Sequence, residues 1–186
     1  LLIASMSEKM TIGAGLNNAL IKQNLSIRNA LLWSPEHPYM HQMITEIIVD
    51  SIIEDQYVTP FGIRTLYFDA DKGLLINKEH IKIHGMAIHN EAGQLGAAVP
   101  IKVWKRRFEK LKGMGCNAIR TAHNPADPLI LDLMDTMGLL CMDEFFDEWT
   151  ICKWSKSRGT KEVPPRGYAE HFDRLHIKDS ETIIRR

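Results

Sequence analysis

The sequence predicts a protein of two parts, a β-sheet region followed by an α/β region built on a parallel sheet. Residues 1 to about 70 form short, β-rich segments separated by polar breaks, without an amphipathic helical pattern. From about residue 74, apolar strands alternate with amphipathic helices, an order typical of parallel strands joined by crossover helices. The pattern changes at the turn-rich stretch FDADKG (68–73), which we take as the boundary.

The first part, residues 1–70, is typical of a partial β-sandwich. Three segments have the composition of strands: IKQNLSI (21–27), YMHQMITEIIV (39–49) and DQYVTPFGI (55–63). Between the first two, Pro35 and Pro38 favour an extended chain that crosses from one strand to the next. We therefore expect strands and no long helix in this part.

The second part, residues 74–186, contains three strand–helix units. The expected strands are 81–88, 117–122 and 139–144, and the expected helices are 100–115, 127–138 and 168–186. Pro100 suits a first helical turn, Asp127 with Pro128 begins the second helix, and Gly138 ends it. Because three such units do not close a barrel, and the chain ends in TIIRR without a cap, we expect a piece of a longer α/β protein. The third expected strand lacks the partner that a closed barrel would supply, so we expect the isolated segment to be poorly soluble or to self-associate. A homo-oligomer is a further expectation.

Composition excludes several functions. The chain has 186 residues, 45% hydrophobic and 25% charged, with a net charge of zero, so it lacks the electrostatic basis for binding nucleic acid or an anionic membrane. No apolar run approaches the roughly 20 residues that span a bilayer. Cys116, Cys141 and Cys152 lack zinc-like spacing. The N-terminal LLIASMSEKM has neither an initiator Met nor signal-peptide features, so we interpret it as an interior cut. We expect a soluble protein, and the sequence leaves its localisation open between cytoplasmic and periplasmic or secreted.

Polar residues follow each predicted strand of the second part, the place where a (β/α)8 barrel carries its chemistry. His89 follows the first strand, and Arg120 and His123 follow the second. The third strand leads into acidic and aromatic residues: Asp143, Glu144, Asp147, Glu148 and Trp149. This mixture of donors, acceptors and an aromatic platform suits a hydroxyl-rich ligand. We expect His89, Arg120 and Asp143 to converge on one concave patch. A plainer interpretation is a structural ion pair between Arg120 and Asp143.

Five blocks of the sequence resemble glycoside hydrolase family 2, the β-galactosidase and β-glucuronidase family. The blocks are LWSPEHPY (32–39), FGIRTLYFDADKGLLIN (61–77), IKIHGMAIHNE (81–91), MGCNAIRTAHNPADP (114–128) and MGLLCMDEFFDEW (137–149). The resemblance implies an immunoglobulin-like β-sandwich followed by a (β/α)8 TIM barrel. Residues 1–70 would then be the later strands of the sandwich, and residues 74–186 the first three βα units of the barrel.

The resemblance also implies an activity, the retaining hydrolysis of terminal β-glycosidic bonds by double displacement, with a terminal β-galactoside as the expected substrate. It places Arg120 beside the nucleophilic carboxylate, which the guanidinium keeps ionised. It makes His89 and His123 ligands of the sugar. We count seven residues as substrate-binding candidates: His89, Arg120, His123, Asp143, Glu144, Glu148 and Trp149.

Three departures from the family pattern matter. Asn124 stands where the family has Tyr, which leaves the identity of the sugar open. The Glu-x-His of magnesium-dependent β-galactosidases corresponds here to Glu148, Trp149 and Thr150, so we predict no metal site and no cofactor. Both catalytic carboxylates of the family lie on later strands, so we expect no catalytic residue within this chain and no hydrolysis by the chain alone.

Other functions fit the same residues. The chain could belong to a β-glucuronidase or β-mannosidase, or to a catalytically silent carbohydrate-binding or scaffold protein of the same fold. A metal-dependent hydrolase using His84, His89 and His123 is disfavoured because His84 and His89, five residues apart, face opposite sides of a strand.

Overall fold

The computed structural model describes residues 2–13, 15, 19–153 and 167–185. It divides into two compact units, residues 1–31 and 32–186. The described residues of the first unit form neither helix nor strand, so the expectation of a strand at 21–27 is wrong. An alternating pattern becomes a strand only where a neighbouring strand accepts its backbone hydrogen bonds, and among the described residues no strand pairs with this stretch.

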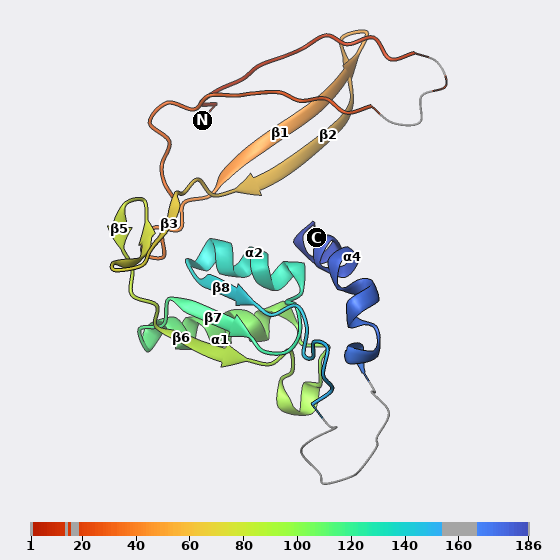
Figure 1. Ribbon diagram of the computed structural model, residues 1–186. Coiled ribbons are helices and arrows are strands. Elements are labelled where there is room, and N and C mark those ends of the chain that lie inside the picture. Colours follow the sequence, from red (N-terminus) through yellow and green to blue (C-terminus); the bar gives the residue numbers. More distant parts are fainter. Residues whose placement is uncertain (1, 14, 16–18, 154–166, 186) are drawn as a thin grey trace. The chain divides into compact units, whose positions relative to one another are not determined.

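A long antiparallel hairpin opens the second unit, formed by β1 (His41–Val49) and β2 (Ile52–Phe61) (Figure 1). Its turn residues Asp50 and Ser51 both have positive φ, 50° and 67°, as tight hairpin turns require. The hairpin confirms the strands expected at 39–49 and 55–63, and no helix interrupts the described residues between 20 and 65. Most of its apolar side chains are exposed.

A small antiparallel sheet follows, with strand order β3 (Leu66–Asp69), β4 (Gly73–Ile76) and β5 (Glu79–His80). The stretch 68–73 covers the end of β3, the turn at 70–72 and the first residue of β4. Asp69 organises this turn, because its Oδ1 accepts hydrogen bonds from the backbone N–H groups of Asp71 and Lys72, both at 2.9 Å. These two bonds lower the pKa of Asp69.

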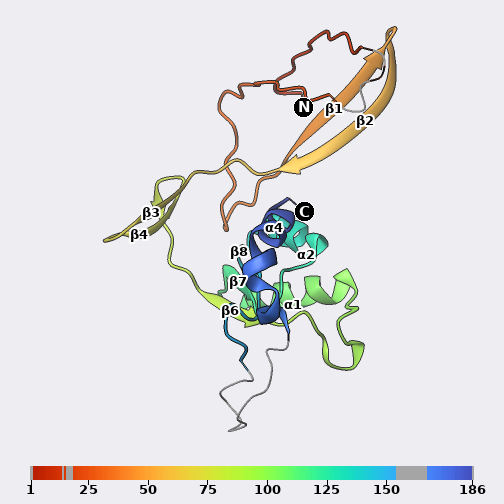
Figure 2. The same ribbon diagram turned by 45° about the vertical axis from the view of Figure 1, so that its right-hand side comes forward.

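The α/β part has a parallel sheet in the order β6 (Gly85–Ile88), β7 (Ala118–Thr121) and β8 (Leu140–Asp143). Helix α1 (Ile101–Gly113) connects β6 to β7, and α2 (Pro128–Met137) connects β7 to β8 (Figures 1 and 2). A short 3-10 turn, η1 (Gly93–Leu95), precedes α1. The predicted strand–helix order is confirmed for these elements.

The third predicted helix, 168–186, is present as a 3-10 turn η2 (Tyr168–Glu170) and the helix α4 (Phe172–Ile184). The caps of α2 agree with the sequence. Asp127 Oδ1 accepts the N–H of Leu129 at 2.8 Å, and Gly138 ends the helix in the left-handed conformation.

The core of the α/β part lies between the two crossover helices and one face of the sheet. It consists of Trp104, Phe108, Ile119, Ala126, Ile130, Met134 and Leu139. Along β7, Ile119 is buried in this core while its neighbour Arg120 is exposed, because successive strand side chains alternate between faces. The hydrophobic core therefore packs against the helix-covered face of the sheet, and Arg120 lies on the opposite face.

The block around Trp33 is anchored to the α/β part. The Trp33 side chain is fully buried, and its indole N–H donates to the Asp135 carbonyl at 2.7 Å. Asn77 donates to the Trp33 carbonyl at 3.0 Å, and the Arg64 guanidinium lies 4.6 Å from the indole centroid. The sequence predicted only an extended crossing here, whereas the structure uses the segment as a buried anchor.

Candidate functional site

The strand register determines which residues share the open face of the sheet. Arg120 is paired with Met142, and Thr121 with Asp143. Side chains alternate along a strand, so Arg120 and Glu144 fall on one face while Thr121 and Asp143 fall on the other. The ends of β7 and β8 thus bring a guanidinium and a carboxylate together at the sheet's carboxyl edge.

Glu144 is the central acceptor of this edge. Its Oε1 accepts from Arg120 Nε at 2.5 Å and forms an ion pair with a terminal nitrogen of the same guanidinium. Its Oε2 accepts the backbone N–H of His123 at 2.5 Å. The hydrogen bond from His123, together with the Arg120 guanidinium, lowers the pKa of Glu144, so this carboxyl is held ionised.

A second cluster surrounds the His123 ring. His123 has φ of 72°, in the left-handed region that few non-glycine residues occupy. Its Nδ1 lies 2.5 Å from Asp147 Oδ1, and Lys153 Nζ pairs with the same carboxylate oxygen while lying 3.2 Å from Nδ1. The His89 ring lies beside it, with centroids 5.1 Å apart. The Lys153 hydrogen bond is the main cause that lowers the pKa of Asp147.

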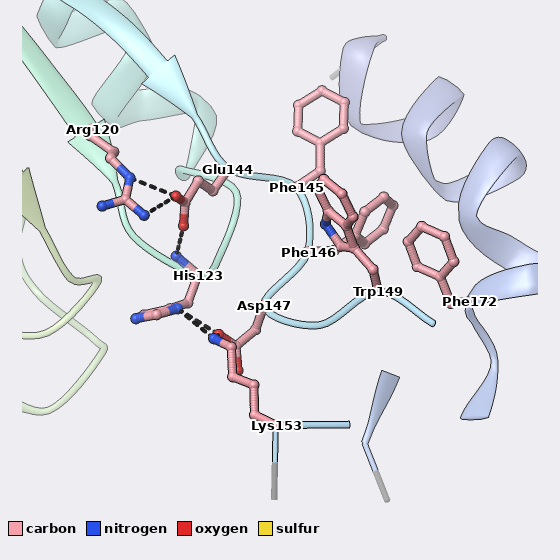
Figure 3. Close-up of a pocket in the computed structure, with 9 residues that line it drawn as sticks. All are labelled: Arg120, His123, Glu144, Phe145, Phe146, Asp147, Trp149, Lys153 and Phe172. Atoms are coloured by element: carbon pink, nitrogen blue, oxygen red, sulfur yellow. Dashed lines mark hydrogen bonds and ion pairs between the residues drawn. The ribbon is translucent and has the colours of Figure 1, made fainter. Parts of the chain in front are cut away.

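Both clusters line one pocket of about 500 Å³, within the range of small-molecule sites. Its lining residues are Arg120, His123, Glu144, Phe145, Phe146, Asp147, Trp149, Lys153 and Phe172. Figure 3 shows the charged groups on one side and the aromatic rings on the other. The aromatic wall continues behind the pocket, because Phe146 stacks on Tyr168 with centroids 4.7 Å apart. The arrangement can offer hydrogen bonds and an apolar ring surface to the same ligand.

Asp143 does not join this pocket, and the expectation that it converges with His89 and Arg120 is wrong. Its Oδ1 accepts from Thr121 Oγ1 at 2.7 Å and from the Ala126 N–H at 2.9 Å, on the helix-covered face of the sheet. The interpretation as an Arg120–Asp143 ion pair fails for the same reason: the guanidinium pairs with Glu144. Because side chains alternate along a strand, Asp143 and Glu144 point to opposite faces, and only Glu144 faces the pocket.

Glu148 and Trp149 follow the strand end with different environments. Glu148 is buried, with Oε1 accepting the Lys153 N–H at 3.1 Å, and it does not line the pocket. Trp149 does line the pocket and is 69% exposed. Among the five other predicted site residues, Arg120, His123 and Glu144 line the pocket, His89 packs on His123, and Asp143 faces away.

The sequence reasoning missed part of the pocket. Phe145, Phe146, Phe172 and Lys153 were not among the site candidates. Asp147 was named among the polar residues that follow the third strand but was not counted as substrate-binding. The aromatic pair in DEFFDEW, directly after a strand end, was an available signal for Phe145 and Phe146. No local sequence pattern indicates Lys153 as a site residue, because it is the path of the loop after β8 that brings its ammonium group to Asp147.

The histidines do not gather as a metal site would require. His84 immediately precedes β6 and His89 follows it, so the strand separates them. Over the described ranges, no group of three His, Cys, Asp or Glu side chains is placed to hold a metal ion. In that same part of the chain, every helix is too short or too polar to cross a membrane.

Comparison with known families identifies the class of protein. Residues 70–179 match the family described as "Glycosyl hydrolases family 2, TIM barrel domain", and residues 3–64 match "Glycosyl hydrolases family 2". The chain belongs to glycosyl hydrolase family 2. The resemblance inferred from the five sequence blocks is thereby confirmed.

The curated relatives include proteins named beta-galactosidase and proteins named beta-glucuronidase. Beta-galactosidase BoGH2A of Bacteroides ovatus is 38% identical over 164 residues, which are 88% of this chain and 18% of that protein. The beta-glucuronidase of Mus musculus is 28% identical over 167 residues, 87% of this chain and 24% of that protein. The chain therefore spans about a fifth of the length of such relatives.

Solved structures agree with this assignment. A beta-glycosidase from Bacteroides vulgatus has a TM-score of 0.76 and 38% identity, covering 86% of this chain and 20% of that one. The beta-glucuronidase from Ruminococcus gnavus, in complex with D-glucuronic acid, has a TM-score of 0.69 and 26% identity, covering 86% and 25%. The sheet-rich and barrel parts of the family are thus both represented in the chain.

Proposed function

We propose that the whole protein is an exo-acting, retaining β-glycosidase of family 2, with a terminal β-galactoside as its substrate. In this proposal residues 1–70 are the later strands of the immunoglobulin-like sandwich, and residues 74–186 are the first three βα units of the barrel. The chain supplies one wall of the sugar-binding pocket. The acid/base and the nucleophile come from later strands of the barrel.

The observation that carries the proposal is the bonded group of Arg120, Glu144 and His123 at the strand ends. Glu144 engages Nε and one terminal nitrogen of the Arg120 guanidinium. A guanidinium has five N–H donors, so the remaining donors stay available to a second carboxylate. A retaining glycosidase needs one carboxylate held ionised as nucleophile, and a guanidinium oriented by Glu144 provides that charge in a fixed direction.

The charge of the pocket favours a neutral sugar over a glucuronate. Among the described residues that line it, the pocket has two cations, Arg120 and Lys153, and two carboxylates, Glu144 and Asp147. Each cation is paired with one of these carboxylates at hydrogen-bonding distance. The net charge of this described lining is therefore zero, so it gives a uronate no net attraction, while sugar hydroxyls would find both donors and acceptors. This supports β-galactosidase over β-glucuronidase as the activity.

Kinetics of the whole protein test the proposal. We expect turnover of an aryl β-galactoside, slower turnover of the matching β-glucuronide, and a loss of about 10²-fold or more in kcat/KM for Arg120→Ala, or about 2.7 kcal/mol of transition-state stabilisation. Arg106→Ala is the matched control, because Arg106 lies exposed on α1. Preference for the glucuronide would refute the choice of sugar, and an unchanged Arg120→Ala rate would refute the role of Arg120.

The isolated 186-residue chain provides a second test. Retention requires two carboxylates about 5 Å apart, one free to donate a proton and one free to attack. In the described part of the pocket, Glu144 is bonded to Arg120 and His123, and Asp147 to Lys153 and His123. We expect no hydrolysis above background by this chain. Turnover that disappears in Glu144→Gln would show that the catalytic carboxylates were misplaced.

A further inference from the structure

Asp147 and Lys153 form an ion pair that contacts the imidazole ring of His123, a residue expected to bind the sugar. Asp147 Oδ1 lies 2.5 Å from His123 Nδ1 and also pairs with Lys153 Nζ. Lys153 Nζ lies 3.2 Å from the same ring nitrogen. Figure 3 shows the other ring nitrogen of His123 turned away from both residues. The pair therefore acts on one side of the imidazole and leaves the other side for a ligand.

Hydrogen-bond chemistry determines which ring nitrogen carries the proton. Nδ1 has a single in-plane position, so in the neutral ring it either donates to Asp147 or accepts from Lys153. An ionised carboxylate can only accept, and Asp147 is held ionised by the Lys153 ammonium group. The Asp147 contact is also shorter than the Lys153 contact, 2.5 Å against 3.2 Å. Both facts favour donation from Nδ1–H to Asp147.

The rest of the ring is also fixed. The His123 backbone N–H donates to Glu144 Oε2 at 2.5 Å, and the residue has a left-handed φ of 72°. His89 packs beside the ring, with an interplanar angle of 31°. In the part of the chain that the structure describes, the charged or titratable groups around the imidazole are thus Asp147, Lys153, Glu144 and His89. Among these, the short contact to the ring nitrogen comes from Asp147.

We propose that Asp147, oriented by Lys153, is a positioning residue that holds neutral His123 in the Nδ1–H tautomer and so presents Nε2 as an acceptor for one sugar hydroxyl. The role in sugar binding rests on the proposed glycosidase function. The tautomer does not, because it follows from contacts within this chain. The two can therefore be tested separately.

Nitrogen-15 NMR of the histidine side chains tests the tautomer directly. The spectrum of the 186-residue chain would be recorded at alkaline pH, where imidazoles are neutral, and the His123 signals assigned by their loss in His123→Gln. We expect Nδ1 to be protonated and Nε2 unprotonated. Asp147→Asn should shift the ring toward the Nε2–H tautomer, because an amide N–H can donate to Nδ1. Asp71→Asn, in the exposed turn between β3 and β4, is the control.

Lys153→Met separates the two possible partners of Nδ1. With Asp147 intact, we expect this variant to keep the Nδ1–H tautomer, and Lys72→Met is its exposed control. The proposal is overturned if wild-type His123 is the Nε2–H tautomer. It is also overturned if Asp147→Asn leaves the tautomer unchanged, or if Lys153→Met alone converts it.

Kinetics of the whole protein test the role in sugar binding. Asp147→Asn should lower kcat/KM for an aryl β-galactoside on the order of 10- to 100-fold, because one hydrogen bond to the sugar is mispaired. For the deoxy-galactoside that lacks the contacted hydroxyl, the same substitution should have little effect. An equal loss for all deoxy substrates would overturn the sugar contact. Absence of any glycosidase activity would refute the proposed function and leave the NMR result to decide the tautomer.

Discussion

Replacing Gly138 by alanine tests how the Trp33 block is joined to the α/β part. Gly138 ends α2 with φ of 69° and ψ of 49°, a left-handed conformation. A Cβ added there would lie 2.3 Å from the Pro35 carbonyl oxygen and 3.0 Å from its carbonyl carbon. Both contacts are with backbone, so the clash cannot be relieved by rotating a side chain.

The expected cost has two contributions. Left-handed backbone costs an L-residue such as alanine about 1–2 kcal/mol. Moving Pro35 also disturbs Lys112, whose Nζ donates to the carbonyls of Pro35 at 3.3 Å and Gly138 at 3.4 Å, and each net hydrogen bond is worth about 1 kcal/mol. We expect a total destabilisation of about 2–4 kcal/mol. For a chain of this size, that lowers Tm by roughly 5–15 °C.

Thermal and urea unfolding of the chain, followed by far-ultraviolet circular dichroism, would measure the effect. Gly113→Ala is the control, because Gly113 is the last residue of α1 and no atom lies within 4 Å of its added Cβ. It should be neutral or stabilise by up to about 1 kcal/mol. Gly138→Asn separates the two contributions, since Asn tolerates left-handed backbone but keeps the clash. If Gly138→Ala unfolded like the wild type, the close approach to Pro35 would be wrong.

Two further predictions concern pH. Desolvation and the Tyr168–Asp179 hydrogen bond of 2.6 Å raise the pKa of Tyr168 to about 12. The stability it contributes is present below about pH 10 and lost as the pH rises toward 12, because the unfolded chain loses that proton first. Ultraviolet titration should show one tyrosine ionising late, and Tyr168→Phe should remove that step; a Tyr168→Phe curve equal to the wild type would contradict this. Burial raises the pKa of Asp135, so its ionised form costs stability at neutral pH. Asp135→Asn should therefore raise Tm at pH 7, with the gain vanishing as the pH falls below about 4, where the wild-type carboxyl is neutral as well. A lower Tm for this variant at pH 7 would show that the carboxylate is stabilising.

The sequence by itself determined the order of elements in the α/β part. Three local patterns predicted them: the helical spacing of apolar residues, the Asp127 and Gly138 caps, and short apolar strands. Such patterns can be read from the sequence without knowing the fold, because they depend on residues close together in the chain. The same signals placed His89, Arg120 and His123 at strand ends. They failed at 21–27, where a strand pattern lacks a partner strand in the structure, because pairing is not a local property.

The tertiary structure decided which of these residues form the pocket. Strand register turned Asp143 toward the helices and Glu144 toward Arg120, although the two acids are adjacent in the sequence. The loop after β8 brought Lys153 to Asp147, and α4 brought Phe172 to the pocket wall. Such contacts join residues far apart in sequence or within irregular loops, where no periodic pattern records which side chains will meet. Only the folded chain supplies that information, because the contact exists only after the strands have paired and the helices have packed.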